Sequence, residues 1–268
     1  MLYCVLYPAG DVGKRIVFNI VQYPTILSLP DRLTGVNDYH PSLPCLSLAV
    51  ALVRPSVAVE LGVYRGDSLC TIAQICRELA LKTRIYGIDT FHGDENSGFY
   101  GDAVIEDLQR YLRENDYHSV QLIRSTLDEA RPKFNDISID LLHIDAGHSY
   151  EEVKHDFETW APRLSSRGCV VFHDTHLLIN PNCHVWKFWA ELRAAHPDLT
   201  FEFPWAWGVG LFQAGPTMSP GMKDLLALRG KEMENVQTFV RHIGHTVVDH
   251  YATRHNMQQI VAGFGSAG

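Results

Sequence analysis

Acidic and imidazole side chains follow two apolar runs of this sequence. Asp145 closes the run IDLLHID and His148 comes three residues later, while His173 and Asp174 close the run GCVVFHD. If the runs are adjacent parallel strands, about 4.8 Å apart, Asp145 and Asp174 can share one divalent cation. His148, whose ordinary pKa is about 6.5, suits a base that takes a proton from a hydroxyl at neutral pH. We therefore expect a site that makes an oxygen nucleophilic, with Asp145 and His148 as catalytic residues.

The same residues also have a purely structural interpretation. The two aspartates can organise loop amides without a cation, and His148 can hydrogen-bond the loop backbone. Ser149 precedes the sequence YEEV and is typical of a helix N-cap, so Asp145 and His148 are expected in a short strand-to-helix loop.

A second motif is the glycine-bearing sequence VAVELGVYRGDS, residues 57–68. It predicts a strand, a tight turn and a helix, in which Gly62 and Gly66 let the backbone approach a ligand closely. Glu60 stands where a G-x-G-x-x-G turn would have its first glycine. A carboxylate there suits a cationic amino-acid ligand and would repel a pyrophosphate. Glycines after a strand are also common in turns that bind nothing.

Asp89 ends the next apolar run, RIYGID. A carboxylate at this station can accept hydrogen bonds from both hydroxyls of a ribose. The alternative is an aspartate that caps its own loop. Its position one strand after the glycine turn favours a nucleoside ligand.

These motifs recur within a regular alternation of elements. From residue 56 onward, short apolar runs alternate with helix-period stretches, which predicts an α/β fold with a doubly wound, Rossmann-like sheet. The segment LTFEFPWAWGVGLFQA then predicts two strands and a turn, giving a mostly parallel sheet with an antiparallel C-terminal hairpin. We divide the chain into an N-terminal arm and lead-in helix (1–55), the α/β domain (56–215) and a helical C-terminal extension (216–268).

The two extensions carry weaker signals. Residues 1–40 have little periodicity, so no role follows for them from the sequence. The C-terminal extension has an apolar stripe at helical spacing, which packs on its own domain or forms a homo-oligomer contact. The stripe consists of Val236, Val240, Ile243, Val247 and Tyr251. We expect the final GFGSAG to be disordered.

Composition excludes several classes of partner. The formal charge of −8 and the absence of a basic block argue against nucleic-acid binding. No apolar run approaches about 20 residues, and the charges near the start follow the apolar stretch, so we expect neither a membrane span nor a signal peptide. Six scattered cysteines without a CxxC pair predict reduced, buried thiols. A cytoplasmic protein is the resulting expectation.

Two stretches of this chain resemble a known family. Residues 88–104 and 141–176 are similar to bacterial S-adenosylmethionine (SAM) dependent class I methyltransferases, a group that includes sugar and natural-product O-methyltransferases. The resemblance covers about residues 56–213. The family usually has tryptophan and histidine where this chain has Phe91 and Asn96.

The resemblance implies a set of binding residues. Glu60, Gly62 and Gly66 would contact the methionine end of SAM, Asp89 its ribose, and Ser125 its adenine. We add four neighbouring positions as cofactor contacts: Tyr64, Ser68, Thr90 and Asp145. In metal-dependent relatives, two carboxylates at these strand ends and the residue beside the second one bind Mg²⁺. Here the ligands would be Asp145 and Asp174 with His173 or Thr175.

The function expected from these features is methyl transfer to a hydroxyl of a small molecule, such as a sugar or natural product. The acceptor pocket is expected to contain Trp205 and Trp207, whereas Trp186 and Trp189 are expected in the core. Two other functions stay open: a nicotinamide-dependent oxidoreductase on the same sheet, and a SAM-binding accessory protein without catalysis.

Overall fold

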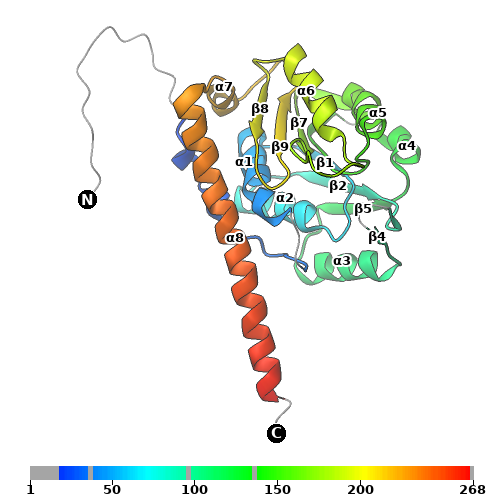
Figure 1. Ribbon diagram of the computed structural model, residues 1–268. Helices are drawn as coiled ribbons and strands as arrows, with labels where there is room; N and C mark the ends of the chain where they lie inside the picture. Colours follow the sequence, from blue (N-terminus) through cyan, green and yellow to red (C-terminus); the bar gives the residue numbers. More distant parts are fainter. Residues whose placement is uncertain (1–17, 36–38, 95–97, 135–137, 266–268) are drawn as a thin grey trace, which may run out of the picture.

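A seven-stranded sheet forms the centre of the structure, a computed structural model that describes residues 18–35, 39–94, 98–134 and 138–265 (Figure 1). The strand order is β5-β2-β1-β6-β7-β9-β8, and the first five strands in this order run parallel. The parallel strands are β1 (Val57–Leu61), β2 (Arg84–Asp89), β5 (Val120–Arg124), β6 (Ile139–Ile144) and β7 (Leu164–His173). Because the order reverses between β1 and β6, the strand ends there leave room for a ligand.

An antiparallel hairpin completes the sheet after β7. Strand β9 (Val209–Gln213) pairs with β7, and β8 (Thr200–Phe203) forms the edge. A separate short hairpin joins β3 (Gly93–Asp94) to β4 (Gly98–Phe99). The sheet thus confirms the predicted Rossmann-like fold and its hairpin, whereas the small β3–β4 hairpin was not predicted because it contains only two residues in each strand.

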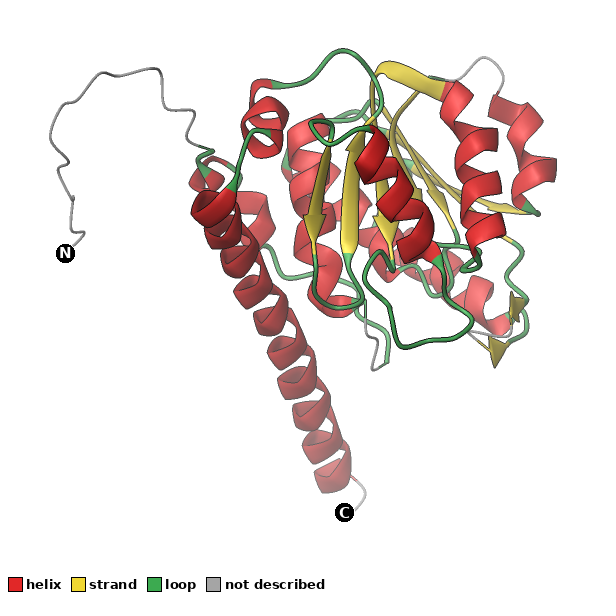
Figure 2. Ribbon diagram, turned by 45° about the horizontal axis from the view of Figure 1, so that its top comes forward, coloured by secondary structure: helices red, strands yellow, loops and turns green. Residues whose placement is uncertain are grey.

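Helices cover both faces of the sheet (Figure 2). One buried apolar cluster lies on each face, between the sheet and its helices, because successive side chains of a strand point to opposite faces. The first face carries α1 (Leu43–Val53), α2 (Asp67–Glu78), α3 (Ala103–Glu114) and α7 (Pro220–Leu226). The second carries α4 (Leu127–Ala130), α5 (Tyr150–Trp160) and α6 (Val185–Ala195). Five 3₁₀ turns are η1 (Ile20–Gln22), η2 (Pro24–Leu27), η3 (His40–Ser42), η4 (Arg131–Phe134) and η5 (Ala161–Arg163).

The long helix α8 (Gly230–Gly265) lies along one side of the domain, and its C-terminal part extends past it (Figure 1). It packs against η3, α1 and η2. The stripe residues Val236, Val240, Ile243 and Val247 are buried, and Tyr251 meets the ring of His40 at 5.3 Å. The stripe therefore packs on its own domain. We expected disorder from residue 263, but α8 continues through Gly265, and residues 266–268 lie outside the described ranges.

Other expectations concern buried thiols and membrane segments. Five cysteines are free and buried: Cys45, Cys70, Cys76, Cys169 and Cys183. Cys4 lies outside the described residues. Among the residues that the structure describes, no helix has both the length and the apolar character that a membrane span needs.

The packing of α8 can be tested with two valines of the same helix. Val240 is fully buried, so Val240→Ala removes packed carbon atoms and leaves a cavity. We expect a loss of about 2 kcal/mol in the free energy of unfolding, measured by urea denaturation. Val248 is 39% exposed, and Val248→Ala should change that free energy by less than about 0.5 kcal/mol. An equal loss in both variants would contradict this arrangement.

Candidate active site

A cavity of about 850 Å³ opens at the carboxyl ends of the parallel strands. Its wall includes the turn after β1, the ends of β2 and β5, the loop after β6 and the residues after β7. Residues Thr34, Gly35 and Tyr39 of the N-terminal segment close one side. The cavity thus joins the predicted cofactor motif and the predicted catalytic residues in one space.

The turn after β1 requires glycine at two positions. Gly62 has φ +82°, and a Cβ there would lie 2.0 Å from the carbonyl oxygen of Asp145. Gly66 has φ +81°, and a Cβ there would lie 2.6 Å from the Leu108 side chain. A side chain at Gly62 would therefore meet backbone that cannot give way. Both glycines line the cavity, as do the expected contacts Tyr64, Ser68, Thr90 and Ser125.

Asp89 lines the cavity and also holds the turn in shape. One carboxylate oxygen accepts hydrogen bonds from the backbone N–H groups of Val63 and Tyr64, both at 2.8 Å, and the other accepts one from Phe91 at 2.6 Å. The loop-capping interpretation is therefore correct. Oδ2 already accepts two hydrogen bonds, whereas Oδ1 accepts one and has a second lone pair, so Asp89 retains acceptor capacity through Oδ1.

Glu60 lies beneath the cavity rather than in its wall. Its side chain is fully buried, and one oxygen accepts a hydrogen bond from Ser68 Oγ. Burial raises the pKa of the Glu60 carboxyl, although contact with His143 opposes the shift. The expected direct contact with a cationic ligand is therefore not available in this arrangement. The reason is geometric: Glu60 is within β1, one residue before the strand ends, and its side chain enters the interior.

Three predicted catalytic and metal-binding residues come together at the other end of the cavity. One ligand atom each from Asp145, His148 and Asp174 lies within 4.8 Å of the others. His148 Nε2 is 3.1 Å from an oxygen of Asp174, and the His148 side chain is 20% exposed. Pairing of β6 with β7 produces this cluster, because it brings the two strand ends side by side.

His173 faces the carboxylates in a different way from the one expected for a metal ligand. Its Nδ1 lies 3.2 Å from an oxygen of Asp145 and 3.2 Å from an oxygen of Asp174. The ring is 7% exposed, and its Nε2 is buried. His173 therefore bridges the two carboxylates as a hydrogen-bonding partner, outside the group of three. Thr175 is buried and does not line the cavity, so it does not supply a third ligand here.

The pKa values of the side chains in and beside this cluster differ from their ordinary values. Burial lowers the pKa of His173, but the charges of Asp174 and Asp145 outweigh it and raise the value to about 9. Burial alone would raise the pKa of Asp145, yet His173 holds it below its usual range. Burial likewise opposes protonation of His148, and the hydrogen bond to Asp174 reverses that effect, so its pKa is raised. At neutral pH His173 is a cation between two carboxylates.

The loop that carries His148 is fixed at its end by a capping box. Ser149 Oγ accepts from the backbone N–H of Glu152, and the Glu152 carboxylate accepts from the N–H of Ser149, as the sequence predicts for a helix start. Asp156, one turn further along α5, is buried against the backbone of Gly147. The loop after β6 is therefore held from below by α5.

Of the four tryptophans with a predicted location, two differ from it. Trp207 lines the cavity and Trp189 is buried, both as expected. Trp205 packs against the core, with its ring 5.2 Å from that of Phe203, because the tight turn at residues 206–208 points neighbouring side chains to opposite sides. Trp186 is only partly buried and lines a shallow surface hollow.

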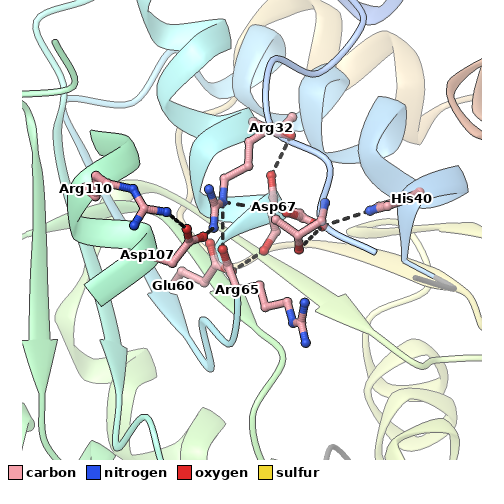
Figure 3. A network of polar contacts seen from close by, with 10 residues as sticks. Arg32, His40, Glu60, Arg65, Asp67, Asp107 and Arg110 are labelled. Carbon is pink, nitrogen blue, oxygen red and sulfur yellow. Dashed lines mark hydrogen bonds and ion pairs between the residues drawn. The ribbon is translucent and has the colours of Figure 1, made fainter. Parts of the chain in front are cut away.

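The N-terminal segment contributes to the cavity, which was not predicted from the sequence. Arg32, Thr34 and His40 all meet Asp67, the first residue of α2, and Asp67 itself lines the cavity (Figure 3). His40 Nε2 is 2.8 Å from the Asp67 carboxylate, and the Thr34 backbone N–H is 3.1 Å from it. The sequence offers no local sign of this contact, because the segment has no periodicity and its polar residues are isolated.

Two residues depart from the pattern that is usual in the resembling family. Phe91 is buried in the core, and Asn96 lies outside the described residues.

Comparisons with known proteins agree with this geometry. A family model described as a methyltransferase domain matches residues 59–175. Within this chain, these residues are therefore similar to a methyltransferase domain. The matched segment runs from within β1 to the residues just after β7, so it contains both the glycine turn and the cluster of Asp145, His148 and Asp174.

One curated protein and two solved structures are similar to parts of this chain. Protein y4gI of Sinorhizobium fredii, described as uncharacterized, is 38% identical over 180 residues, which cover 66% of this chain and 19% of that protein. The chain thus spans about a fifth of that relative's length. The crystal structure of O-methyltransferase TomG from Streptomyces achromogenes, involved in tomaymycin synthesis and solved with SAM, has a TM-score of 0.51 at 16% identity, covering 72% of this chain and 86% of TomG. Cofactor-bound Rv0187 from MTB has a TM-score of 0.51 at 15% identity, covering 74% and 88%. At these identities the two structures establish the fold alone.

Buried Asp156, which supports the loop after β6, predicts a pH dependence of stability. Burial, with the nearby charges of Asp128 and Glu152, raises the pKa of Asp156 to about 7, although His155 opposes the shift. Its unfolded value is about 3.9, so the stability that Asp156 contributes is fully present below about pH 4 and is lost as pH rises through about 7. Asp156→Asn resembles the protonated form and should remove this loss.

We expect the variant's free energy of unfolding, relative to wild type, to increase by up to about 4 kcal/mol between about pH 4 and about pH 7. Urea denaturation at several pH values measures it. Asp116→Asn, at an aspartate that is 88% exposed, controls for the change of residue type. A difference between Asp156→Asn and wild type that stays constant with pH would contradict the assignment.

Proposed function

We propose that this methyltransferase domain transfers the methyl group of SAM to a hydroxyl of a small molecule. The observation that carries the proposal is the single cavity, which has the glycine turn at one end and the Asp145/His148/Asp174 cluster at the other. Methyl transfer needs the donor and the acceptor oxygen in line and in contact. One space bounded by both motifs meets that need.

The donor end of the cavity supports SAM in particular. The turn at Gly62–Gly66 offers backbone that a ligand can approach, and Asp89 has free acceptor capacity at the end of β2. Thr90 and Ser125 continue the wall toward the β2 and β5 ends. In this proposal Asp89 serves the ribose while it also holds the turn, and Ser125 lies beside the adenine.

The acceptor end has donor atoms that fit a divalent cation. Two carboxylates and one imidazole present ligand atoms within 4.8 Å of one another, and His148 Nδ1 is buried without a hydrogen-bond partner among the described residues. Asp145 and Asp174 would hold the ion, and when bound it would lower the pKa of an acceptor hydroxyl. A set of two oxygens and a nitrogen accommodates Mn²⁺ as well as the Mg²⁺ suggested by the family.

His148 receives the proton in the proposed reaction. The acceptor oxygen bonds to the methyl carbon while the carbon–sulfur bond of SAM breaks, and the hydroxyl proton passes to the imidazole. Asp174, 3.1 Å from Nε2, orients the ring and stabilises its protonated form. Because the imidazole must be neutral before it accepts a proton, its raised pKa moves the onset of activity to a higher pH than an unperturbed histidine would give.

One observation favours a second role for His148, as a third cation ligand: one of its ring nitrogens lies within 4.8 Å of ligand atoms of both carboxylates. Metal affinity separates the two roles. In His148→Ala, loss of rate with unchanged Mn²⁺ affinity identifies a base, whereas a parallel loss of Mn²⁺ affinity identifies a ligand.

The remaining alternatives concern the ligand and the acceptor. Trp207 and Leu177 give the acceptor end an apolar wall, which suits a sugar ring or another small natural product. A calorimetric titration with SAM and with NAD separates the methyltransferase from an oxidoreductase. Release of S-adenosylhomocysteine with a panel of hydroxylated acceptors separates an enzyme from an accessory protein.

Exposed Phe239 and Val248 on α8 support homo-oligomer formation through this helix, which sedimentation analysis would test.

Removal of the Asp89 carboxylate tests the donor site. Asp89→Ala leaves the N–H groups of Val63, Tyr64 and Phe91 without their acceptor and removes the proposed ribose contact. We expect the affinity for S-adenosylhomocysteine to fall at least about tenfold, which corresponds to about 1.4 kcal/mol. Calorimetry measures the affinity, and Asp128→Ala, an exposed aspartate outside the cavity, is the control. Unchanged affinity in Asp89→Ala would remove this residue from the site.

Removal of the His148 imidazole tests the acceptor site. We expect His148→Ala to lower kcat by about 10²–10⁴-fold, as for loss of a positioned base, while the affinity for S-adenosylhomocysteine stays within about twofold. His155→Ala, at an exposed histidine of α5, should leave kcat unchanged. Full activity in a folded His148→Ala variant eliminates the base. Turnover that EDTA leaves unchanged eliminates the cation, and Mn²⁺ titration followed by electron paramagnetic resonance tests the ligands directly.

A further inference from the structure

Tyr39 lies where the N-terminal segment reaches the candidate active site. Its side chain is 6% exposed and lines the cavity. Its ring edge packs on His173, with centroids 4.3 Å apart and planes at 72°, and its hydroxyl is 2.9 Å from Nε2 of His143. We infer that Tyr39 is a positioning residue for the acceptor site, because it fixes the His173 ring that holds the carboxylates of Asp145 and Asp174. The kinetic part of this inference rests on the proposed methyl transfer, and the structural part does not.

The contact with His173 controls two carboxylates at once. His173 Nδ1 is 3.2 Å from both Asp145 and Asp174, so rotation of the ring would weaken both contacts. The backbone of Ala206 also interacts with the His173 ring, while Nε2 is buried and has no side-chain hydrogen-bond partner among the described residues. The edge of the Tyr39 ring packs directly on the imidazole, so it restricts the rotation that would weaken both carboxylate contacts.

The hydroxyl of Tyr39 extends the same arrangement beneath the cavity. His143 is fully buried in β6, two residues before Asp145, and its Nδ1 is 3.6 Å from a carboxylate oxygen of Glu60. Glu60 in turn accepts a hydrogen bond from Ser68 in the first turn of α2. Tyr39 thus stands between the acceptor cluster and a buried polar path that leads to the donor end. This gives Glu60 a supporting role in place of the direct contact we had expected.

The segment that carries Tyr39 is anchored on both sides. His40 and Thr34 bind the Asp67 carboxylate, and Arg32 donates to the backbone carbonyl of Arg65 at 2.9 Å (Figure 3). The Arg32 guanidinium is 7% exposed and also pairs with Asp107 at 2.7 Å. A segment held by buried charge pairs keeps Tyr39 in one place, which a positioning residue needs.

The first arm of the test uses full-length protein labelled with ¹⁵N at histidine, without any ligand. Long-range ¹H–¹⁵N spectra report the ring environment of each histidine, and His143→Asn and His173→Asn variants assign the signals. Tyr39→Leu removes the ring and should shift the signals of both histidines. Tyr39→Phe keeps the ring and should shift those of His143 while leaving His173 in place. Unchanged His173 signals in a folded Tyr39→Leu variant would overturn the inference.

The second arm measures rates. We expect Tyr39→Leu to lower kcat at least about tenfold with SAM affinity within about twofold, because misplacement of reacting groups slows chemistry more than it weakens binding. Tyr39→Phe should retain kcat within about threefold. Tyr111→Phe, at a half-buried tyrosine whose ring lies 4.7 Å below the Arg32 guanidinium, controls for loss of a hydroxyl in the same network. Equal kcat losses in Tyr39→Phe and Tyr39→Leu would contradict a role of the ring.

The two arms distinguish a failure of the proposed methyl transfer from a failure of the inference about Tyr39. If the wild-type protein releases no S-adenosylhomocysteine with any acceptor, methyl transfer fails, while the histidine spectra still decide the role of Tyr39. If Tyr39→Leu does not fold, Tyr39→Met, which keeps buried volume without a ring, takes its place: unchanged His173 signals in that variant overturn the inference.

Discussion

The close approach of two backbone segments determines the rest of this site. The turn after β1 lies so near the loop after β6 that a Cβ on Gly62 would overlap the carbonyl oxygen of Asp145. The backbone N–H of Asp145 also donates to the carbonyl of Leu61 at 2.9 Å. Donor turn and acceptor loop therefore share one contact, and neither can shift alone. The absence of a side chain at one position makes the two ends of the cavity neighbours.

The acceptor cluster illustrates how charges can remain near each other in a partly enclosed space. Two carboxylates at adjacent strand ends would repel, but the imidazolium of His173 lies between them. His148 approaches the same pair from the cavity side. His173 thus contacts one oxygen of each carboxylate, and the second oxygen of Asp174 faces His148. A second-layer histidine of this kind commonly tunes residues that bind ions or protons.

The features that were predictable from the sequence are those with a local signature. Alternating runs identified the sheet, the sequence SYEEV identified the start of α5, and the strand ends identified Asp145, Asp174 and Asp89 as members of one edge. The direction in which a side chain points at a strand end was harder to predict from the sequence. Nothing local distinguishes Glu60, which points inward, from Asp89, which lines the cavity, because the difference depends on register and strand length.

Contacts between residues far apart in the chain could not be predicted either, because they too lack a local sequence signature. Tyr39 and His173 are far apart in the chain, and the segment around Tyr39 has no periodicity that would indicate a partner. His173 was expected to bind a metal because its residue type and position allow it. Its actual role depends on which nitrogen faces the carboxylates, which is a property of the ring rotation and of its packing against Tyr39.

The position of α8 has a consequence for the order of assembly. Val247 packs with Tyr39 and Leu43, and Tyr251 meets His40, so the segment that closes the cavity is itself covered by the last helix of the chain. During synthesis the sheet can form as soon as β9 has emerged, but Tyr39 gains its outer cover only after some thirty-five further residues have been added. Such contacts between distant parts of a chain form slowly. The segment that closes the cavity therefore gains its full cover only when the last helix of the chain is in place.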